Sequence, residues 1–151
     1  MSLEQKLSDF EVLREFTTKE IKLLATFIEV KKYEDGEEII GKDTETTSLL
    51  FILSGKVRIN RSFPGGGLFM TQLGSKEVFG EVAFADQKER TASALSIGKS
   101  EIGSFDYGHF AIIKKQDAVF GMKLLQELMR LLASKFRAVN KKLDGIFSQN
   151  V

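Results

Sequence analysis

The spacing of hydrophobic residues changes from helical to strand-like near residue 30. Before that point, Thr17 and Glu20 have the spacing of a capping box, in which each side chain bonds the backbone N–H of the other residue. Apolar residues then recur at helical spacing, at Ile21, Leu24, Ala25 and Ile28. The pattern predicts a helix that begins at about Thr17.

Short apolar runs separated by turn sequences follow this helix. Residues 49–53 are continuously apolar and predict a central strand, whereas Val57 and Ile59 alternate with polar neighbours as in a half-buried strand. Later strands are predicted at about 92–97 and 101–105. The turn sequences are Asp35-Gly36, Ser54-Gly55, Pro64-Gly65-Gly66-Gly67 and Gly74-Ser75. They predict hairpins, and therefore an all-β unit over about residues 30–105.

A helical pattern returns in the C-terminal part of the chain. Asp106 and Asp117 are suited to act as N-caps of a short helix and then of a long one. Apolar residues of the long helix recur at steps of three and four, as in a coiled coil, at Leu125, Leu128, Leu132, Phe136, Val139, Leu143 and Ile146. These C-terminal helices are predicted to occupy about residues 106–147.

The long helix would extend about 45 Å, which is more than a compact β-barrel needs as cover. An apolar stripe on a helix usually packs on its own domain. We expect both kinds of contact, with Phe120, Leu124 and Leu128 on the barrel. The later positions, from Leu132 to Ile146, are then expected to join a second copy of the chain in a parallel homodimer.

Composition narrows the classes of function. The formal net charge is +1, so the overall charge does not favour nucleic acid or a membrane surface as partner. There is no cysteine, which excludes disulfides and thiolate metal sites. No apolar run has transmembrane length, and residues 1–19 are too charged for a signal peptide. We therefore expect a cytoplasmic protein that forms one domain over residues 1–151.

The residues common in enzyme active sites are sparse. His109 is the sole histidine and has no carboxylates at ligand spacing, so neither a metal site nor a histidine-based triad is predicted. An enzyme on a cupin-like barrel would need two or three histidines around a metal. The chain is therefore expected not to be an enzyme.

One short segment pairs a carboxylate, Glu81, with a guanidinium, Arg90. A carboxylate accepts hydrogen bonds from ribose hydroxyls, and a planar guanidinium fits two phosphate oxygens at once. Gly80 allows a close turn, and small residues leave room for backbone N–H groups to face a phosphate, at Ala83, Thr91 and Ala92. The segment predicts an anion-binding loop for a cyclic nucleotide. We expect Arg90 to be exposed when no ligand is bound.

This segment resembles the phosphate-binding cassette of the cyclic nucleotide-binding domain family, which includes catabolite activator protein-like sensors. The matching residues are Phe79, Gly80, Glu81, Arg90 and Ala92. Glycines near residues 36, 55 and 74 fall where strands of the family carry turn glycines, and the resemblance covers about residues 16–147. It implies that Glu81 holds the ribose 2′-hydroxyl, that Arg90 holds the cyclic phosphate, and that Thr91 contacts phosphate or purine.

The resemblance and the patterns together predict a mainly β fold: a jelly-roll barrel with N-terminal helices and a long C-terminal helix. Asn140 lies near where the family places residues that touch the purine, although a solvated asparagine is an equal alternative. The predicted ligand-binding residues are Phe79, Gly80, Glu81, Val82, Ala83, Arg90, Thr91, Ala92 and Asn140. Thr91 is compatible with both cAMP and cGMP.

The predicted function is sensing of cAMP or cGMP, with the ligand ordering the loop 80–91 and thereby moving the long helix. One alternative is a vestigial pocket on a ligand-free scaffold or protein-interaction module. Another is that Glu81 and Arg90 form an ordinary surface salt bridge. The chain ends at Val151, soon after the long helix, so DNA binding through a following helix-turn-helix is not expected. The sequence does not identify the downstream protein partner.

Overall fold

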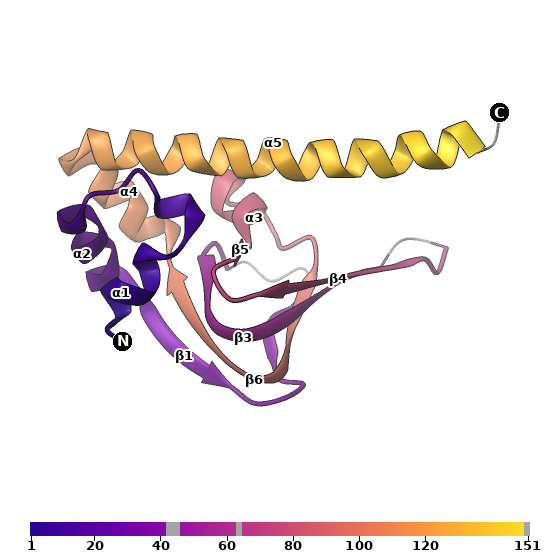
Figure 1. The fold of residues 1–151 in the computed structure, drawn as a ribbon, viewed down its shortest axis with the longest axis horizontal. Helices are drawn as coiled ribbons and strands as arrows, with labels where there is room; N and C mark the ends of the chain where they lie inside the picture. The colour runs from indigo at the N-terminus through magenta and orange to yellow at the C-terminus, as the bar shows by residue number, and fades with distance from the viewer. Residues whose placement is uncertain (42–45, 63–64, 150–151) are drawn as a thin grey trace.

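The protein is described by a computed structural model over residues 1–41, 46–62 and 65–149. Figure 1 shows its arrangement: a curved antiparallel sheet, a group of short helices at one end, and the long helix α5 across the top. The short helices preceding the sheet are α1 (Leu3–Ser8), a 3₁₀ turn η1 (Glu11–Leu13) and α2 (Thr18–Phe27).

The capping box predicted at the start of α2 is confirmed. The Glu20 backbone N–H donates to Thr17 Oγ1 at 3.2 Å, and the Thr17 N–H donates to Glu20 Oε1 at 2.8 Å. The same Glu20 oxygen accepts a bond from Lys123 Nζ at 2.6 Å. The start of α2 is thereby tied to α5.

In the described residues the sheet has six strands in antiparallel pairing: β1 (Glu29–Tyr33), β2 (Glu38–Ile40), β3 (Leu49–Ser62), β4 (Leu68–Gly74), β5 (Val78–Phe79) and β6 (Ser93–Phe105). The order along the main path is β1-β6-β3-β4, while β2 pairs with β6 and β5 pairs with β3. These strands lie within the predicted all-β region. The long strands β3 and β6 bend strongly, so the sheet curls around an inner face (Figure 1).

Two predicted strand boundaries are wrong, and glycine is the reason in both cases. Ser54-Gly55 was expected to form a turn, but Gly55 lies inside β3 at a β-bulge, with φ of +91°. A Cβ there would lie 2.5 Å from the carbonyl oxygen of Lys99. The two strands expected at 92–97 and 101–105 form the single strand β6, with Gly98 in the middle at φ of +67°. Glycine at positive φ suits bulges as well as turns.

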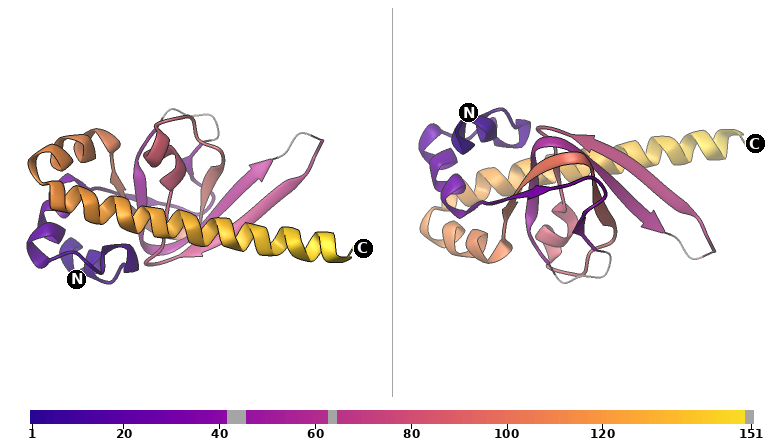
Figure 2. Two further views of the ribbon diagram at one scale, coloured as in Figure 1. Left: turned by 90° about the horizontal axis from the view of Figure 1, so that it is seen from above. Right: turned by 90° about the horizontal axis from the view of Figure 1, so that it is seen from below.

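The predicted hairpin between β3 and β4 is confirmed by its pairing, in which Ser62 lies opposite Leu68. Pro64, which belongs to the predicted turn sequence, lies outside the described residues. In both views of Figure 2 this hairpin extends toward the same end of the molecule as the C-terminus of α5. The two elements meet where Lys142 Nζ lies 4.9 Å from the centroid of the Phe69 ring.

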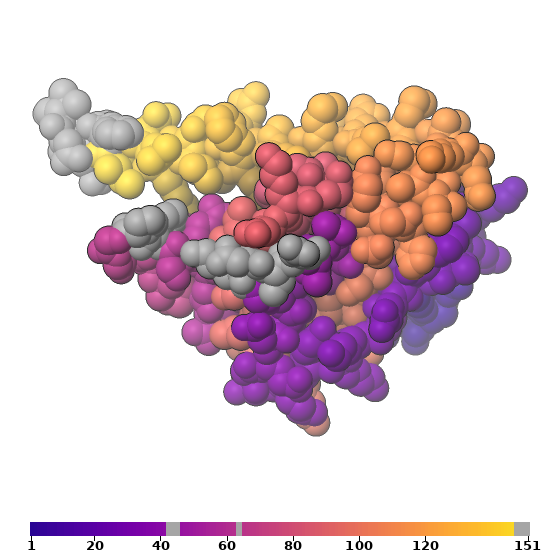
Figure 3. All heavy atoms as spheres, turned by 180° about the vertical axis from the view of Figure 1, so that it is seen from behind, coloured from indigo at the N-terminus to yellow at the C-terminus, as the bar shows by residue number. Residues whose placement is uncertain are grey.

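The C-terminal helices are α4 (Tyr107–Gln116) and α5 (Ala118–Gln149). Both predicted caps are present, since Asp106 accepts a bond from the Gly108 N–H at 3.0 Å and Asp117 accepts one from the Phe120 N–H at 3.1 Å. The space-filling view of Figure 3 shows α5 as a ridge over the molecule, with the short helix α3 (Glu81–Asp86) directly beneath it.

The core has two parts. The larger part joins the short helices, α4 and the first half of α5 to one face of the sheet, through fully buried rings such as Phe51, Phe105 and Phe110. The smaller part lies inside the curve of the sheet and contains Phe79 and Ile102. The expectation that the first turns of α5 pack on the domain is confirmed, because Phe120, Leu124 and Leu128 are buried.

Most of the remaining apolar stripe on α5 is exposed, but Leu132, which was expected at the dimer interface, is half-buried. The stripe also differs by one residue from the predicted pattern. Leu128 points into the core and its neighbour Met129 points outward, with 65% of its surface exposed. The outer stripe therefore repeats at steps of three and four, apart from one step of seven across the half-buried Leu132. Its exposed members are Met122, Leu125, Met129, Phe136, Val139, Leu143 and Ile146. Across the described ranges, we find no helix with both the length and the apolar character needed to cross a membrane.

Candidate functional site

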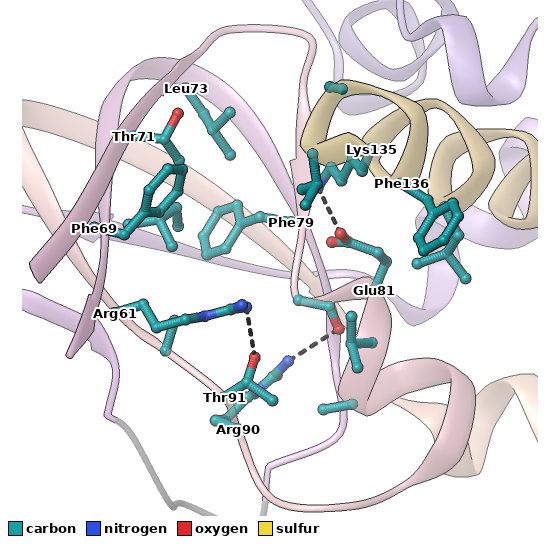
Figure 4. A pocket seen from close by; sticks show the side chains of 18 of the residues that line it. Arg61, Phe69, Thr71, Leu73, Phe79, Glu81, Arg90, Thr91, Lys135 and Phe136 are labelled. Carbon is teal, nitrogen blue, oxygen red and sulfur yellow. Dashed lines mark hydrogen bonds and ion pairs between the residues drawn. The ribbon is translucent and has the colours of Figure 1, made fainter. Parts of the chain in front are cut away.

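A cavity of about 550 Å³ lies between the inner face of the sheet, the short helix α3 (Glu81–Asp86) and α5. Figure 4 shows charged and aromatic side chains from these elements around it. The strands supply Ile40, Ile59, Arg61, Phe69, Thr71 and Leu73; residues 79–83 and 90–92 form the floor; and α5 supplies Leu132, Lys135, Phe136, Ala138, Val139 and Lys142.

The segment predicted as a loop at 80–91 contains α3, which starts directly after β5. Gly80 is the residue before the helix and has φ of +77°, a conformation that side-chain-bearing residues rarely adopt. A Cβ at this position would lie 2.6 Å from Arg90 Nη1 and 3.0 Å from the Ser48 carbonyl oxygen. Gly80 is therefore required both for its backbone conformation and for the close approach of Arg90.

Glu81 is only 6% exposed, and its partner comes from the long helix. Its Oε1 atom lies 2.5 Å from Nζ of Lys135, which projects from α5 (Figure 4). This ion pair connects the start of α3 to α5 at the edge of the cavity. Because Glu81 lies at the N-terminus of α3, its negative charge also interacts favourably with the helix dipole.

Arg90 is 3% exposed, so the expectation of an exposed arginine is wrong. All three of its nitrogens donate to the protein itself: Nη1 to the Gly80 carbonyl at 3.0 Å, Nη2 to the Ser48 carbonyl at 2.8 Å, and Nε to Thr46 Oγ1 at 3.1 Å. Burial lowers the pKa of the Arg90 guanidinium, and the nearby charge of Glu81 opposes that effect. These neutral oxygens orient the cation, and among the described residues none of its hydrogen bonds goes to a carboxylate.

The geometry does not fit a simple surface salt bridge between Glu81 and Arg90. Both side chains are buried, and each has other hydrogen-bond partners, Lys135 for Glu81 and neutral oxygens for Arg90. The two charges instead line the same cavity. That arrangement leaves both able to interact with a ligand placed between them.

Eight of the nine predicted site residues line this one cavity: Phe79, Gly80, Glu81, Val82, Ala83, Arg90, Thr91 and Ala92. Asn140 does not belong to the lining, and its side chain is exposed on α5. The α5 residues on the cavity side are instead its neighbours Val139 and Ala138. A residue one position along a helix is turned by about 100°, which accounts for the difference.

The cavity combines positive charge with apolar walls. Among the described residues, its lining includes four cationic side chains, of Arg61, Arg90, Lys135 and Lys142, and one carboxylate, of Glu81. Apolar groups from the strands and α5 complete the walls. Such a site is suited to a ligand that has an anionic group, a hydroxyl group and an apolar ring.

A family model described as the cyclic nucleotide-binding domain matches residues 30–117, which is more than half of the chain. The chain belongs to this family. It is 30% identical over 128 residues to the cyclic AMP receptor protein of Thermus thermophilus, a match that covers 83% of this chain and 57% of the relative. It is also 30% identical over 120 residues to a CRP-like cAMP-activated global transcriptional regulator of Mycobacterium tuberculosis, covering 75% of this chain and 50% of that protein.

Solved structures of cyclic nucleotide-binding proteins share the fold. The catabolite activator protein of Thermus thermophilus superposes with a TM-score of 0.77 at 26% identity, covering 89% of this chain and 62% of the other. A cyclic nucleotide-binding domain from Methylobacillus flagellatus gives a TM-score of 0.82 at 18% identity, covering 93% and 79%. The predicted jelly-roll with flanking helices is thus confirmed. The chain spans between half and three fifths of the length of these curated relatives.

Sequence reasoning missed the residues that reach the cavity of this cyclic nucleotide-binding domain from distant strands and from α5. Arg61, Phe69, Thr71 and Leu73 were not predicted as site residues. The sequence signal that could have identified them is the alternation of side chains along a strand, because every second residue of β3 and β4 faces inward. On α5, Lys135, Val139 and Lys142 line the cavity at helical spacing. In the described part of the chain, no cluster of three or more potential metal-ligating side chains is found.

Proposed function

We propose that this cyclic nucleotide-binding domain senses cAMP or cGMP by binding it in the cavity between α3, the sheet and α5. The observation that carries the proposal is the position of Arg90. Its buried guanidinium is held in place by carbonyl oxygens at one end of the cavity, and an anion is the partner that would compensate its charge. A cyclic phosphate has that charge.

The other polar groups have suitable positions for the rest of a nucleotide. Glu81 lies at the N-terminus of α3 and lines the cavity, where its carboxylate would accept a hydrogen bond from the ribose 2′-hydroxyl. Thr91 adjoins Arg90 and would lie near the phosphate. The apolar side chains from β4 and α5, including Leu73 and Phe136, would surround the purine ring.

Ligand binding would be communicated through α5. This helix contributes Lys135 to the ion pair with Glu81 and several side chains to the cavity wall. A ribose hydroxyl that bonds Glu81 would compete with Lys135 or join it, and a purine would contact Phe136. Either change would favour one position of α5 over another. The helix α5 would then be the two-state element that a sensor requires.

We further propose that the chain forms a parallel homodimer through α5. The exposed stripe from Met122 to Ile146 has the period of a coiled coil once the half-buried Leu132 is included, and an apolar strip of this length is rarely left exposed on a monomer. A dimer would place one cavity on each side of the joined helices. In this proposal the domain is a non-enzymatic cytoplasmic regulator that acts on a protein partner and does not itself contact DNA.

One observation favours the alternative of a ligand-free scaffold. Both charged groups of the cassette already have partners within the protein, because Glu81 pairs with Lys135 and Arg90 is bonded to backbone carbonyls. A vestigial cavity would be satisfied in this way. The difference between a sensor and a scaffold can be measured through ligand-dependent stability.

Thermal unfolding in the presence of cyclic nucleotides tests the proposed function. A ligand at one hundred times its Kd stabilises the folded state by about 2.7 kcal/mol. For a chain of this size that corresponds to a rise in Tm of roughly 5–11 °C. We expect such a rise with cAMP or cGMP and a much smaller one with the acyclic 5′-AMP. An unchanged Tm with both cyclic nucleotides would favour the scaffold.

Replacing Glu81 with glutamine tests the ribose contact. The amide still accepts a bond through its carbonyl oxygen, but it loses the charge-assisted bond, so affinity should fall by about fivefold to tenfold. The preference for a ribose over a 2′-deoxyribose ligand should fall with it. Glu89→Gln is the matched control, because Glu89 is exposed nearby on the same segment. If Glu81→Gln keeps the full preference for the 2′-hydroxyl, Glu81 is not the ribose partner.

A further inference from the structure

The inner face of β3 carries an unexpected charge. Val57 and Ile59 point inward, the first fully buried and the second lining the cavity, and the alternation of the strand places Arg61 next on the same face. Arg61 also lines the cavity. An exposed, charged side chain thus continues the otherwise apolar inner face of β3 at the edge of the cavity.

Arg61 is hydrogen-bonded to Thr91. The Nη2 atom of Arg61 donates to Thr91 Oγ1 at 3.2 Å, and Thr91 follows Arg90 directly in the chain. Figure 4 shows the Arg61 side chain reaching across from β3 to Thr91, beside Arg90. Two guanidinium groups from segments far apart in the sequence, the strand β3 and the loop before β6, therefore approach the same corner of the cavity.

The two arginines differ in how many donors they still offer. A guanidinium has five N–H donors. Arg90 is buried and uses a hydrogen from each of its three nitrogens on the protein. Arg61 is exposed and bonds Thr91 through one nitrogen, so its remaining donors can turn toward a ligand without any buried bond being broken. Arg90 thus supplies a fixed positive charge, and Arg61 supplies adaptable donors.

We propose that Arg61 is a second phosphate-binding residue, which bonds one exocyclic oxygen of the cyclic phosphate while Arg90 bonds the other. The proposal rests on the proposed function, since it places a cyclic nucleotide in this cavity. Thr91 lies between the two groups and would position Arg61 for this contact. The cavity would then distinguish the two exocyclic oxygens, because each faces a different arginine.

Phosphorothioate analogues of the cyclic nucleotide test this assignment. In the Sp and Rp diastereomers, sulfur replaces one or the other exocyclic oxygen and is a poorer hydrogen-bond acceptor. Arg61→Ala should weaken binding of the unmodified nucleotide about tenfold to a hundredfold, as expected for a lost bond to a charged group. It should also remove the penalty for sulfur in only one diastereomer, the one whose sulfur faces Arg61.

Arg58→Ala is the matched control, because Arg58 lies on the same strand and is exposed on its opposite face. Arg61→Lys keeps the charge without the planar fork and should give an intermediate loss. Affinities are measured by isothermal titration on variants with native circular dichroism. Equal affinity of Arg61→Ala and wild type, or weaker binding with unchanged diastereomer discrimination, would overturn the role of Arg61 alone. Absence of binding to the wild type would overturn the proposed function as well.

Discussion

Arg90→Ala is expected to abolish cyclic nucleotide binding at micromolar ligand concentration. Truncating one side of a buried charge pair costs about 2–5 kcal/mol, which corresponds to roughly a thirtyfold to several-thousandfold loss of affinity. The structure adds a second effect. The variant would leave the Gly80 and Ser48 carbonyls without the bonds that Arg90 donates, so we also expect a loss of about 1–3 kcal/mol in the free energy of unfolding.

Isothermal titration and urea unfolding of the same preparations separate these two effects. Lys88→Ala is the control, because Lys88 is an exposed cation on the same segment. Arg90→Lys keeps a positive charge but does not reproduce the three bonds of the guanidinium, and we expect it to bind weakly while remaining folded. A folded Arg90→Ala variant with the affinity of the wild type would refute the phosphate assignment.

Charged substitutions in the exposed stripe of α5 are expected to convert a homodimer to monomers. Burial of each large apolar side chain contributes roughly 1.5–3 kcal/mol, and the cost of association offsets much of that sum. Burying two glutamate charges in the interface would cancel the net stabilisation of the dimer that is left after the cost of association. Phe136 and Val139 lie within the stripe, but they also line the cavity, so their replacement would change dimerisation and ligand binding together.

Leu143→Glu combined with Ile146→Glu avoids that overlap. Both residues are exposed, at 43% and 55%, and neither lines the cavity. Light scattering coupled to size-exclusion chromatography should give a dimer mass for the wild type and a monomer mass for this double variant. Lys141→Glu lies off the stripe and should stay dimeric. A wild-type chain that is monomeric at high micromolar concentration would contradict the proposed interface.

The part of the site that is contiguous in sequence could be predicted, and the part assembled from distant elements could not. Residues 79–83 and 90–92 line the cavity as the cassette pattern indicated. Arg61 and Lys135 reach it from β3 and α5, and their contacts depend on strand register and helix placement. The burial of Arg90 was missed for the same reason, because its acceptor on Ser48 lies 42 positions away.

Fold predictions succeeded where a short sequence pattern corresponds to a single local structure. The caps at Thr17, Asp106 and Asp117 are formed by local bonds and are present as expected. Gly55 was ambiguous, because a glycine at positive φ serves a turn and a bulge equally well. Leu128 and Met129 were ambiguous as well, since a stripe with steps of three and four can shift by one residue between adjacent faces.

Isothermal titration of the wild-type chain with cAMP and with cGMP is the most direct measurement of the central claim, that the cavity binds a cyclic nucleotide. We expect saturable binding of one nucleotide per chain at micromolar concentration for at least one of the two, and far weaker binding of 5′-AMP. Absence of binding by both cyclic nucleotides at millimolar concentration, in a folded preparation, would contradict the claim and indicate a ligand-free scaffold.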